Sequence, residues 1–324
     1  MKKSVFTAAS LLVFALSLTG CGTSAPAAES DFYTIGISQF AEHGSLDNCR
    51  EGFLQGLEQA GLQEGVDYAV HIQNAGGDPA LASQIGDGFS AEQVDLMVGI
   101  ATPSAVACYA AAEERDTPVI FTAITDPVGA KLDSGNITGT SDVLPVEAQL
   151  QLIRAMQPDA HTIGLIYTTS EPNSVYSVGI YEDLAADYGF TMETLGVTSQ
   201  PEVSQAVDTL LSRGVDCLTN ITDNTVTGVL PSTLEKAREA GIPIYGSEIE
   251  QMKLGCVAGA GLDYVQLGIQ TGKMAAKVLT SESTCADLPY EIIEDYDLYV
   301  NSAALEELGL TVPQELLADA TDVG

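Results

Sequence analysis

Short β-rich runs alternate with helical segments along most of the chain. Runs of this length, rich in β-branched residues and bounded by polar residues, predict strands, at 35–40, 68–73, 95–102, 119–125, 162–169, 191–197, 217–222, 242–246 and 256–262. Apolar residues at helical spacing predict helices at 46–60, 79–91, 103–114, 146–156, 175–188, 201–212, 226–240 and 264–279. This alternation is typical of α/β proteins with parallel sheets and right-handed crossovers.

The alternation is interrupted once, at the extended stretch 136–142. Pro145 then opens a helix, and the strand–helix series restarts at Thr162. At roughly 150 residues per domain, a chain of 324 residues has room for two. We therefore predict an α/β fold of two doubly wound parallel-sheet lobes with a junction near residue 142.

The first twenty residues have the pattern of a targeting segment. Lys2 and Lys3 precede an uncharged apolar run at 5–18, which is too short for a transmembrane helix of about 20 residues. The run ends in Leu18-Thr19-Gly20-Cys21, which resembles a lipobox and implies cleavage before Cys21 and lipid on its thiol. The alternative is an ordinary secretory signal with an incidental cysteine. The small polar residues 22–30 predict a flexible spacer. We expect a globular body outside the cytoplasmic membrane, anchored only by its N-terminal lipid.

The charge balance limits the possible partners. The chain has 45 Asp and Glu against 12 Lys and Arg, a net charge of −33. Nucleic-acid binding requires clustered basic residues, and so does docking on an anionic lipid surface. We therefore expect no nucleic-acid partner. The 45% hydrophobic content argues against a disordered chain.

Five cysteines follow the proposed lipid site, at positions 49, 108, 217, 256 and 285. Their number is odd, and no spacing indicates a metal site or a redox pair. Cys108 and Cys217 lie in apolar stretches, which favours burial as small hydrophobic residues. The expected compartment permits disulfides, and the sequence does not decide whether any forms.

Catalytic and cofactor motifs give little support to an enzyme. The segment 268–274 resembles a phosphate-binding loop, but its glycines are one residue too close and Met274 replaces the metal-binding hydroxyl. It lies inside a predicted helix, which favours helix packing. His43, His71 and His161 are far apart, and only His43 lies in a strand-end loop. We expect no cofactor and no metal.

Polar residues follow most of the predicted strands. In open α/β sheets ligands bind beyond the carboxyl ends of the strands, and the segments there are 39–43, 102–104, 125–127, 169–174, 222–224, 247–248 and 263–264. Any one Ser, Thr, Asp or Asn can instead cap a helix. Seven such loops from two lobes together predict a ligand cleft.

Several of these phrases, in this order, carry a family resemblance: Gln39-Phe40 with Glu42-His43, Ala101-Thr102-Pro103-Ser104, Thr125-Asp126-Pro127, Ser170-Glu171 with Asn173-Ser174, Thr222-Asp223-Asn224, Gly246-Ser247-Glu248 and Asp263-Tyr264. Over about 33–310 the chain resembles the substrate-binding lipoproteins of ABC transporters of the tryptophan-binding TrpX type. Gly44 departs from the pattern, where such proteins commonly have proline. The resemblance implies a type I periplasmic-binding-protein fold with three crossover strands. Lobe one is then expected at 31–140 plus 256–282, and lobe two at 141–255 plus 283–324.

The same resemblance implies a non-catalytic receptor that captures an amino acid, aromatic and tryptophan-like, and delivers it to an ABC permease. Backbone N–H groups after Thr102 and Ser170 can hold the ligand carboxylate, and Phe40 can lie along an aromatic ring. Asp126, Asp223 or Asp263 can accept from the ammonium; the alternatives are a turn at Asp126 and a helix cap at Asp223. The candidate ligand-binding residues are Phe40, His43, Thr102, Ser104, Thr125, Asp126, Ser170, Asn173, Ser174, Asp223, Asn224, Glu248 and Asp263. A ligand-sensing surface lipoprotein and, less favoured, a surface hydrolase remain alternatives.

Overall fold

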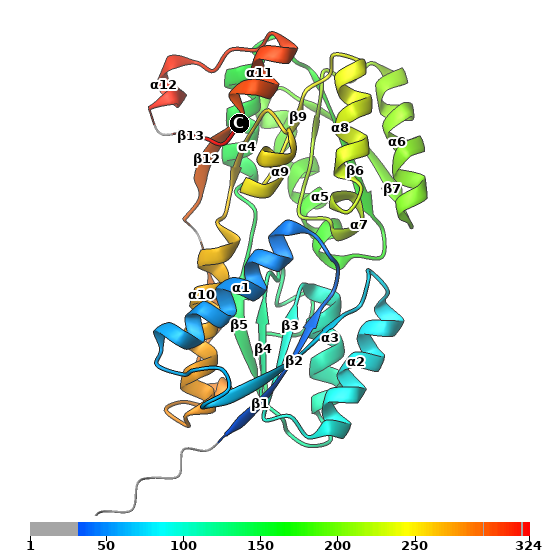
Figure 1. Ribbon diagram of the computed structural model, residues 1–324. Coiled ribbons are helices and arrows are strands. Elements are labelled where there is room, and N and C mark those ends of the chain that lie inside the picture. Colours follow the sequence, from blue (N-terminus) through cyan, green and yellow to red (C-terminus); the bar gives the residue numbers. More distant parts are fainter. Residues whose placement is uncertain (1–31, 294, 319) are drawn as a thin grey trace, which may run out of the picture. The chain divides into compact units, whose positions relative to one another are not determined.

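The computed structural model describes residues 32–293, 295–318 and 320–324 (Figure 1). The predicted signal peptide, Cys21 and spacer therefore lie outside the described residues. None of the described helices is long and apolar enough to cross a membrane.

The first sheet has six parallel strands in the order β11-β5-β4-β3-β1-β2. Its strands are β1 (Tyr33–Gln39), β2 (Tyr68–Asn74), β3 (Leu96–Ile100), β4 (Val119–Thr122), β5 (Ile137–Ser141) and β11 (Glu291–Ile292). Its helices are α1 (Gly44–Gln59), α2 (Pro79–Glu92), α3 (Thr102–Ala112), α10 (Tyr264–Leu279) and η2 (Cys285–Asp287). In Figure 1, α1 and α10 lie on one side of this sheet, and α2 and α3 lie on the other.

The second sheet has four parallel strands in the order β7-β6-β8-β9. They are β6 (Thr162–Thr168), β7 (Thr191–Val197), β8 (Cys217–Thr219) and β9 (Ile244–Tyr245). Backbone hydrogen bonds Val257 N–Ile244 O (2.8 Å) and Gly246 N–Ala258 O (3.0 Å) connect it to a three-stranded sheet. That sheet has the order β10 (Ala258–Gly261), β12 (Asp297–Val300), β13 (Ala320–Asp322). The accompanying helices are α4 (Val146–Met156), α5 (Pro172–Leu184), η1 (Ala185–Tyr188), α6 (Gln200–Arg213), α7 (Asn224–Thr227), α8 (Leu230–Glu239), α9 (Ile249–Leu254), α11 (Ser302–Leu308) and α12 (Gln314–Leu317).

The predicted fold class is confirmed: two α/β lobes with parallel sheets. Three local predictions differ from the structure. The predicted helix 226–240 is two helices, α7 and α8, which are separated at 228–229. Pro231 has no N–H, so it cannot make the helical hydrogen bond that would join them. The strand at 256–262 forms β10, which pairs antiparallel with β12. Helix α9 was not predicted.

The packing of the crossover segments leads us to propose lobe boundaries that differ from the expected ones. Cys256, Val257 and Ala258 pack in the second core, whereas Cys285 packs in the first core and β11 pairs with β5. We therefore assign 32–141 plus 262–293 to lobe one and 142–261 plus 295–324 to lobe two. The first crossover stays near Asp142, while the other two lie later in the chain than the expected 255 and 283.

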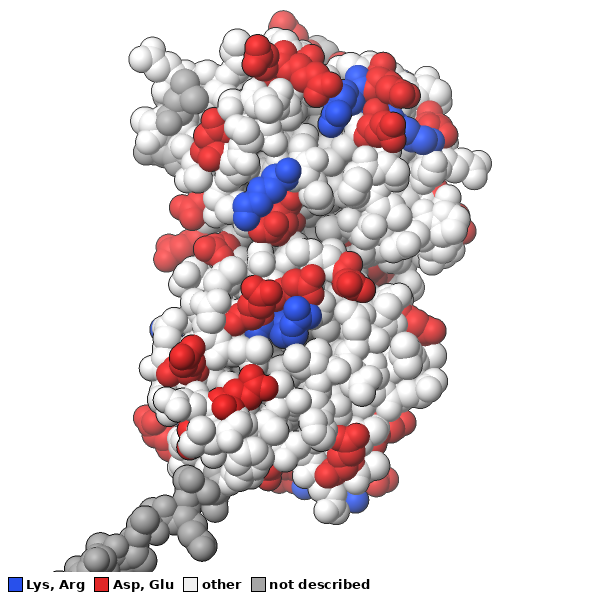
Figure 2. Space-filling view, viewed as in Figure 1, with Lys and Arg blue, Asp and Glu red and all other residues white. Residues whose placement is uncertain are grey.

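The described surface is strongly acidic. On the face shown in Figure 2, acidic side chains outnumber basic ones on both lobes. Several basic side chains lie against acids, as in the pairs Arg50–Asp47, Lys236–Asp208 and Lys253–Glu250. All five described cysteines are buried and free.

Helices α1 and α10 pack backbone against backbone. A Cβ atom added at any of four glycines would lie 2.1–2.3 Å from a carbonyl oxygen of the opposite helix: Gly52, Gly56, Gly268 and Gly272. Real Cβ atoms do not approach an oxygen so closely, and small residues at this spacing permit close helix contact. The glycines that resembled a phosphate-binding loop therefore belong to a packing interface.

We predict that Gly268→Ala destabilises the protein by about 1–3 kcal/mol or more, because its methyl group would overlap the Cys49 carbonyl oxygen at 2.2 Å. Gly88→Ala is the matched control, since Gly88 lies in α2 with no atom within 4 Å of its added Cβ. The control should gain about 0.5–1 kcal/mol. Urea unfolding of the two variants measures both changes, and equal stabilities would contradict the packing assignment.

Candidate ligand-binding site

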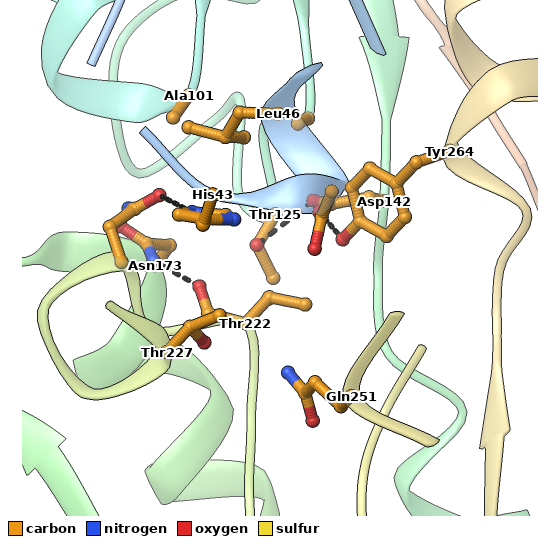
Figure 3. Close-up of a pocket in the computed structure, with 13 residues that line it drawn as sticks. His43, Leu46, Ala101, Thr125, Asp142, Asn173, Thr222, Thr227, Gln251 and Tyr264 are labelled. Atoms are coloured by element: carbon orange, nitrogen blue, oxygen red, sulfur yellow. Dashed lines mark hydrogen bonds between the residues drawn. The ribbon is translucent and has the colours of Figure 1, made fainter. Parts of the chain in front are cut away.

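A chamber lies at the carboxyl ends of the strands, between the two lobes (Figure 3). Its empty volume is about 330 Å³, counted with the part open to solvent. We call this space the inner chamber. Its lining residues are His43, Ser45, Leu46, Ala101, Ala123, Thr125, Asp142, Asn173, Thr222, Asn224, Thr227, Gln251 and Tyr264.

Two strand ends reach the inner chamber through unusual backbone. Ala101, directly after β3, has φ 72°, and Ala123, directly after β4, has φ 58°. Residues other than glycine rarely adopt positive φ, and such strain clusters at ligand-binding sites. With the buried side chain of Leu46, these alanines form an apolar wall of the chamber.

One end of the chamber is built around a buried carboxylate. The Tyr264 hydroxyl donates to Asp142 Oδ2 (2.6 Å), and Thr125 Oγ1 donates to Asp142 Oδ1 (3.0 Å). Burial raises the pKa of the Asp142 carboxyl to about 6, although both hydrogen bonds oppose the shift. No Lys or Arg is among the residues that line the chamber. Asp142, Thr125 and Tyr264 form what we call the acid end, whose negative charge has no cationic partner there.

The opposite end, which we call the amide end, contains His43, Asn173, Asn224 and Thr227. His43 Nε2 lies 3.2 Å from Asn224 Oδ1, and Asn173 Nδ2 donates to the Thr222 carbonyl (3.1 Å). Three buried polar atoms at this end have no described partner: His43 Nδ1, Asn173 Oδ1 and Thr227 Oγ1. A buried polar atom left unpaired costs about 1–3 kcal/mol, so this end is suited to a polar ligand group.

The start of α1 connects the two lobes. His43 contacts Asn224, Asn48 Nδ2 donates to Glu250 Oε1 (3.0 Å), and Ser45 is hydrogen-bonded to Glu248. The Glu250 side chain also lies against Gly44, where an added Cβ would be 3.1 Å from its Cγ. These contacts hold the lobes together around the chamber.

The structure places the predicted ligand-binding residues in three groups. Those that line the inner chamber are His43, Thr125, Asn173 and Asn224. Those that line a wider groove of about 960 Å³ between α2, α3 and α5 are Phe40, Thr102 and Ser170. Those that line neither space are Ser104, Asp126, Ser174, Asp223, Glu248 and Asp263.

The members of the third group have structural partners. Ser104 accepts from Ser38 Oγ, and Asp126 accepts from the Gly129 N–H in a turn. Ser174 Oγ lies 3.4 Å from Asn173 Nδ2. The remaining three carboxylates cap helices, Asp223 on α7, Glu248 on α9 and Asp263 on α10. Their predicted ligand contacts have no support in this geometry. Besides the caps, Asp223 accepts from the N–H and the hydroxyl of Thr168, and Glu248 is hydrogen-bonded to Ser45.

Sequence reasoning did not select Asp142, Tyr264 or Gln251, which also line the chamber. Asp142 follows β5 directly, so extending the strand-end rule to the stretch 136–142 would have found it. Tyr264 follows a strand end too. Gln251 lies inside the short helix α9, where nothing in the local pattern marks it. Among the described residues, the ring of His43 is hydrogen-bonded to an asparagine and to no serine or cysteine, so His43 forms no nucleophile–base pair of the kind that the hydrolase alternative requires.

We predict that Asp142→Asn stabilises the ligand-free protein at pH 7.5 by up to about 3 kcal/mol. The raised pKa of Asp142 means that the folded state binds its proton more tightly than the unfolded chain does. The stability this provides is present below about pH 4 and is lost as the pH rises through about 6. The asparagine in the variant does not ionise, so the variant does not lose this stability at high pH. The difference in stability between variant and parent should therefore become smaller towards pH 4.5.

Urea unfolding at pH 4.5 and 7.5 tests this difference. Asp87→Asn, on the exposed side of α2, is the control and should change stability by less than about 0.5 kcal/mol at either pH. If the Asp142→Asn variant were less stable than the parent at pH 7.5, the prediction would be wrong. The hydrogen bonds to the Asp142 carboxylate would then outweigh the cost of burying its charge.

Sequence comparison identifies the family. The pattern of the family "ABC transporter substrate binding protein" matches residues 34–324. The tyrosine-binding protein of Clostridioides difficile (strain R20291) is 36% identical over 291 residues, which cover 88% of this chain and 82% of that relative.

Two solved structures extend the comparison. The ABC domain from Streptococcus pneumonia in complex with L-Trp is 34% identical, with 90% of this chain and 99% of that chain covered and a TM-score of 0.86. The ligand-free, open structure of a substrate-binding protein with adhesive properties from Clostridium difficile is 35% identical, with 90% and 100% covered and a TM-score of 0.67. At nearly equal identity, the present structure is more similar to the ligand-bound relative. The fold, the interlobe chamber and these similarities agree: the chain belongs to the ABC transporter substrate-binding protein family.

Proposed function

We propose that this protein is an extracytoplasmic solute receptor that binds an aromatic amino acid, tyrosine or tryptophan, and delivers it to an ABC permease. The observation that carries the proposal is Asp142, a carboxylate 2% exposed in an interlobe chamber lined by no Lys or Arg. The names of the relatives, one tyrosine-binding and one in complex with L-Trp, support the choice of ligand.

The chemistry of an amino acid suits the chamber. Its ammonium group supplies the positive charge that Asp142 lacks, and ionised hydrogen-bonded pairs are the stronger ones. Its aromatic ring can lie along the apolar wall of Leu46, Ala101 and Ala123. Burial of a charge without a counter-charge is unfavourable. In the closed, ligand-free protein this applies to Asp142, and the ammonium group of the ligand would offset the unfavourable free energy.

The helices that start at the cleft are suited to the ligand carboxylate. No side chain in the described part of the chain caps the N-termini of α1, α3 and α5, whereas α7, α9 and α10 are capped by carboxylates. Free N–H groups at a helix start bind anions. Of these, the start of α3 is the one proposed for the ligand carboxylate, because α5 begins at Pro172, which has no N–H, and the Ser174 N–H is bonded to the Glu171 carbonyl.

The present arrangement supports a closed state. Lobe-to-lobe contacts from His43, Ser45 and Asn48 surround the chamber, and the ligand-bound relative is the better structural match. We infer that the lobes open by hinging at the crossovers, with the contacts from α1 breaking as they do.

Isothermal titration with a panel of amino acids tests the function. We expect tyrosine or tryptophan to bind the parent and Asp142→Asn to weaken binding by roughly 30- to several-thousand-fold, as for a buried charged contact that loses one partner. The affinity of the parent should also fall as the pH drops below about 6, because the free Asp142 carboxyl with its raised pKa takes up a proton that the ammonium must displace. The affinity of the variant should not follow this pH profile.

Asp126→Asn is the matched control for this titration. Asp126 was a candidate for the same role, but it accepts a hydrogen bond within a turn and does not line the chamber. The Asp126→Asn variant should therefore bind the ligand as tightly as the parent does. Loss of binding in the control and retention in Asp142→Asn would reverse the assignment. Failure of every aromatic amino acid to bind the parent would contradict the proposed function itself.

We further propose that Cys21 carries the lipid anchor, on the lipobox-like residues 18–21 and the polar spacer that follows. Cys21→Ala should release the protein from washed membranes, because acyl chains supply the binding energy. Ligand affinity should not change, since the site lies within residues 43–264. A variant that stays in the membrane fraction would disprove the anchor.

A further inference from the structure

The two polar ends of the inner chamber differ in what they accept. Figure 3 shows Thr125, Asp142 and Tyr264 on one side of the chamber and His43, Asn173 and Thr227 on the other, with Leu46 and Ala101 above them in this view. The acid end carries a negative charge. The amide end carries neutral acceptors. The residues hydrogen-bonded to His43 and Asn173 determine which of their atoms donate and which accept.

His43 presents an unprotonated nitrogen to the chamber. Asn224 Nδ2 donates to Glu171 Oε2 (2.7 Å), so the oxygen Oδ1 is the atom that faces His43. A carbonyl oxygen only accepts, and therefore the His43 Nε2 carries the proton. Burial lowers the pKa of His43, which keeps the ring neutral. Its Nδ1 is then a lone-pair acceptor, and it has no described partner.

Asn173 presents a second acceptor. Its Nδ2 donates to the Thr222 carbonyl (3.1 Å) and lies 3.4 Å from Glu171 Oε2, and both of these oxygens only accept. The amide is therefore oriented with Oδ1 away from those partners. This oxygen is buried and unpaired, in a residue that is 5% exposed and lines the chamber. Two acceptors without a donor lie at one end.

We propose that His43 and Asn173 recognise a hydrogen-bond donor on the aromatic ring of the ligand, so that the site selects tyrosine and tryptophan against phenylalanine. This inference rests on the proposed function and adds the basis of its selectivity. With the ammonium at the acid end, the ring extends along the apolar wall to the amide end. The phenol O–H of tyrosine or the indole N–H of tryptophan then donates to one of the two free acceptors.

Phenylalanine would leave both acceptors desolvated and unpaired. Sites built to hydrogen-bond a ligand OH or NH discriminate strongly against the analogue that lacks it. Thr227 does not set this preference, because its hydroxyl can rotate to donate or to accept. The selectivity therefore resides in His43 and Asn173, whose hydrogen-bonding states are fixed by their neighbours.

The experiment compares ligands that differ by one donor. Titration calorimetry on the parent uses tyrosine, phenylalanine and O-methyltyrosine, and tryptophan with 1-methyltryptophan. We expect each ligand that lacks the ring donor to bind at least about 100-fold more weakly than its partner. Phenylalanine binding as tightly as tyrosine would overturn the inference and leave the proposed function standing. Failure of all five ligands to bind would overturn both.

Two variants then locate the discrimination. In His43→Phe and Asn173→Ala the tyrosine-to-phenylalanine affinity ratio should fall by about tenfold or more in each, whatever happens to absolute affinity. Asn48→Ala is the matched control, because it removes another lobe-to-lobe hydrogen bond without lining the chamber. It should weaken both ligands equally. Thermal unfolding of each variant identifies a folding defect, and the parent ligand series tests the inference without any variant.

A reversed ligand orientation gives a different result. If the amide end bound the ammonium group, His43→Phe would keep the tyrosine-to-phenylalanine ratio. The same variant would instead reduce discrimination against 3-(4-hydroxyphenyl)propionate, which lacks the ammonium. That outcome would overturn the inference.

Discussion

Helices α1 and α10 pack directly through their backbones, and this contact fixes the positions of the residues at their N-termini that line the chamber. Glycines on both helices lie against carbonyl oxygens of the other, with no side chain between them. A backbone contact of this kind has no rotamers through which to relax. His43, Ser45 and Leu46 at the start of α1, and Tyr264 at the start of α10, are therefore held at fixed positions beside the first crossover, where Asp142 lies.

The buried charge of Asp142 lowers the stability of the ligand-free protein, and the same charge favours binding of a cationic ligand group. Asp142 is buried among hydroxyl groups and apolar atoms, and the raised pKa of its carboxyl reports the cost of its charge there. The same absence of a counter-charge suits the chamber to a cationic group. Binding sites often retain such unfavourable arrangements, because removing them stabilises the fold at the expense of function. Asp142 is the one carboxylate among the residues that line the inner chamber, so the opposition between stability and binding falls on it there.

The start of α1 also links the lobes, which couples recognition to closure. His43 lines the chamber and contacts Asn224 of lobe two with the same ring, through different nitrogens. Ser45 and Asn48 contact the start of α9 in lobe two. A ligand group that pairs with His43 Nδ1 would therefore stabilise a ring that already bridges the lobes. Gly44 lies against the Glu250 side chain at this junction.

Local patterns in the sequence determined the α/β class and predicted a junction near residue 142 and the strand-end loops, because strand and helix periodicities depend on neighbouring residues. They also marked His43, Thr125, Asn173 and Asn224, which line the chamber. They did not separate these from Asp223, Glu248 and Asp263, because helix caps and ligand contacts use the same polar side chains. Nor did they show that β10 pairs antiparallel with β12, since its partner lies some 40 residues away. Only the tertiary structure decided which polar atoms are already paired and which are not, because burial and hydrogen-bond partners depend on segments that meet from opposite ends of the chain.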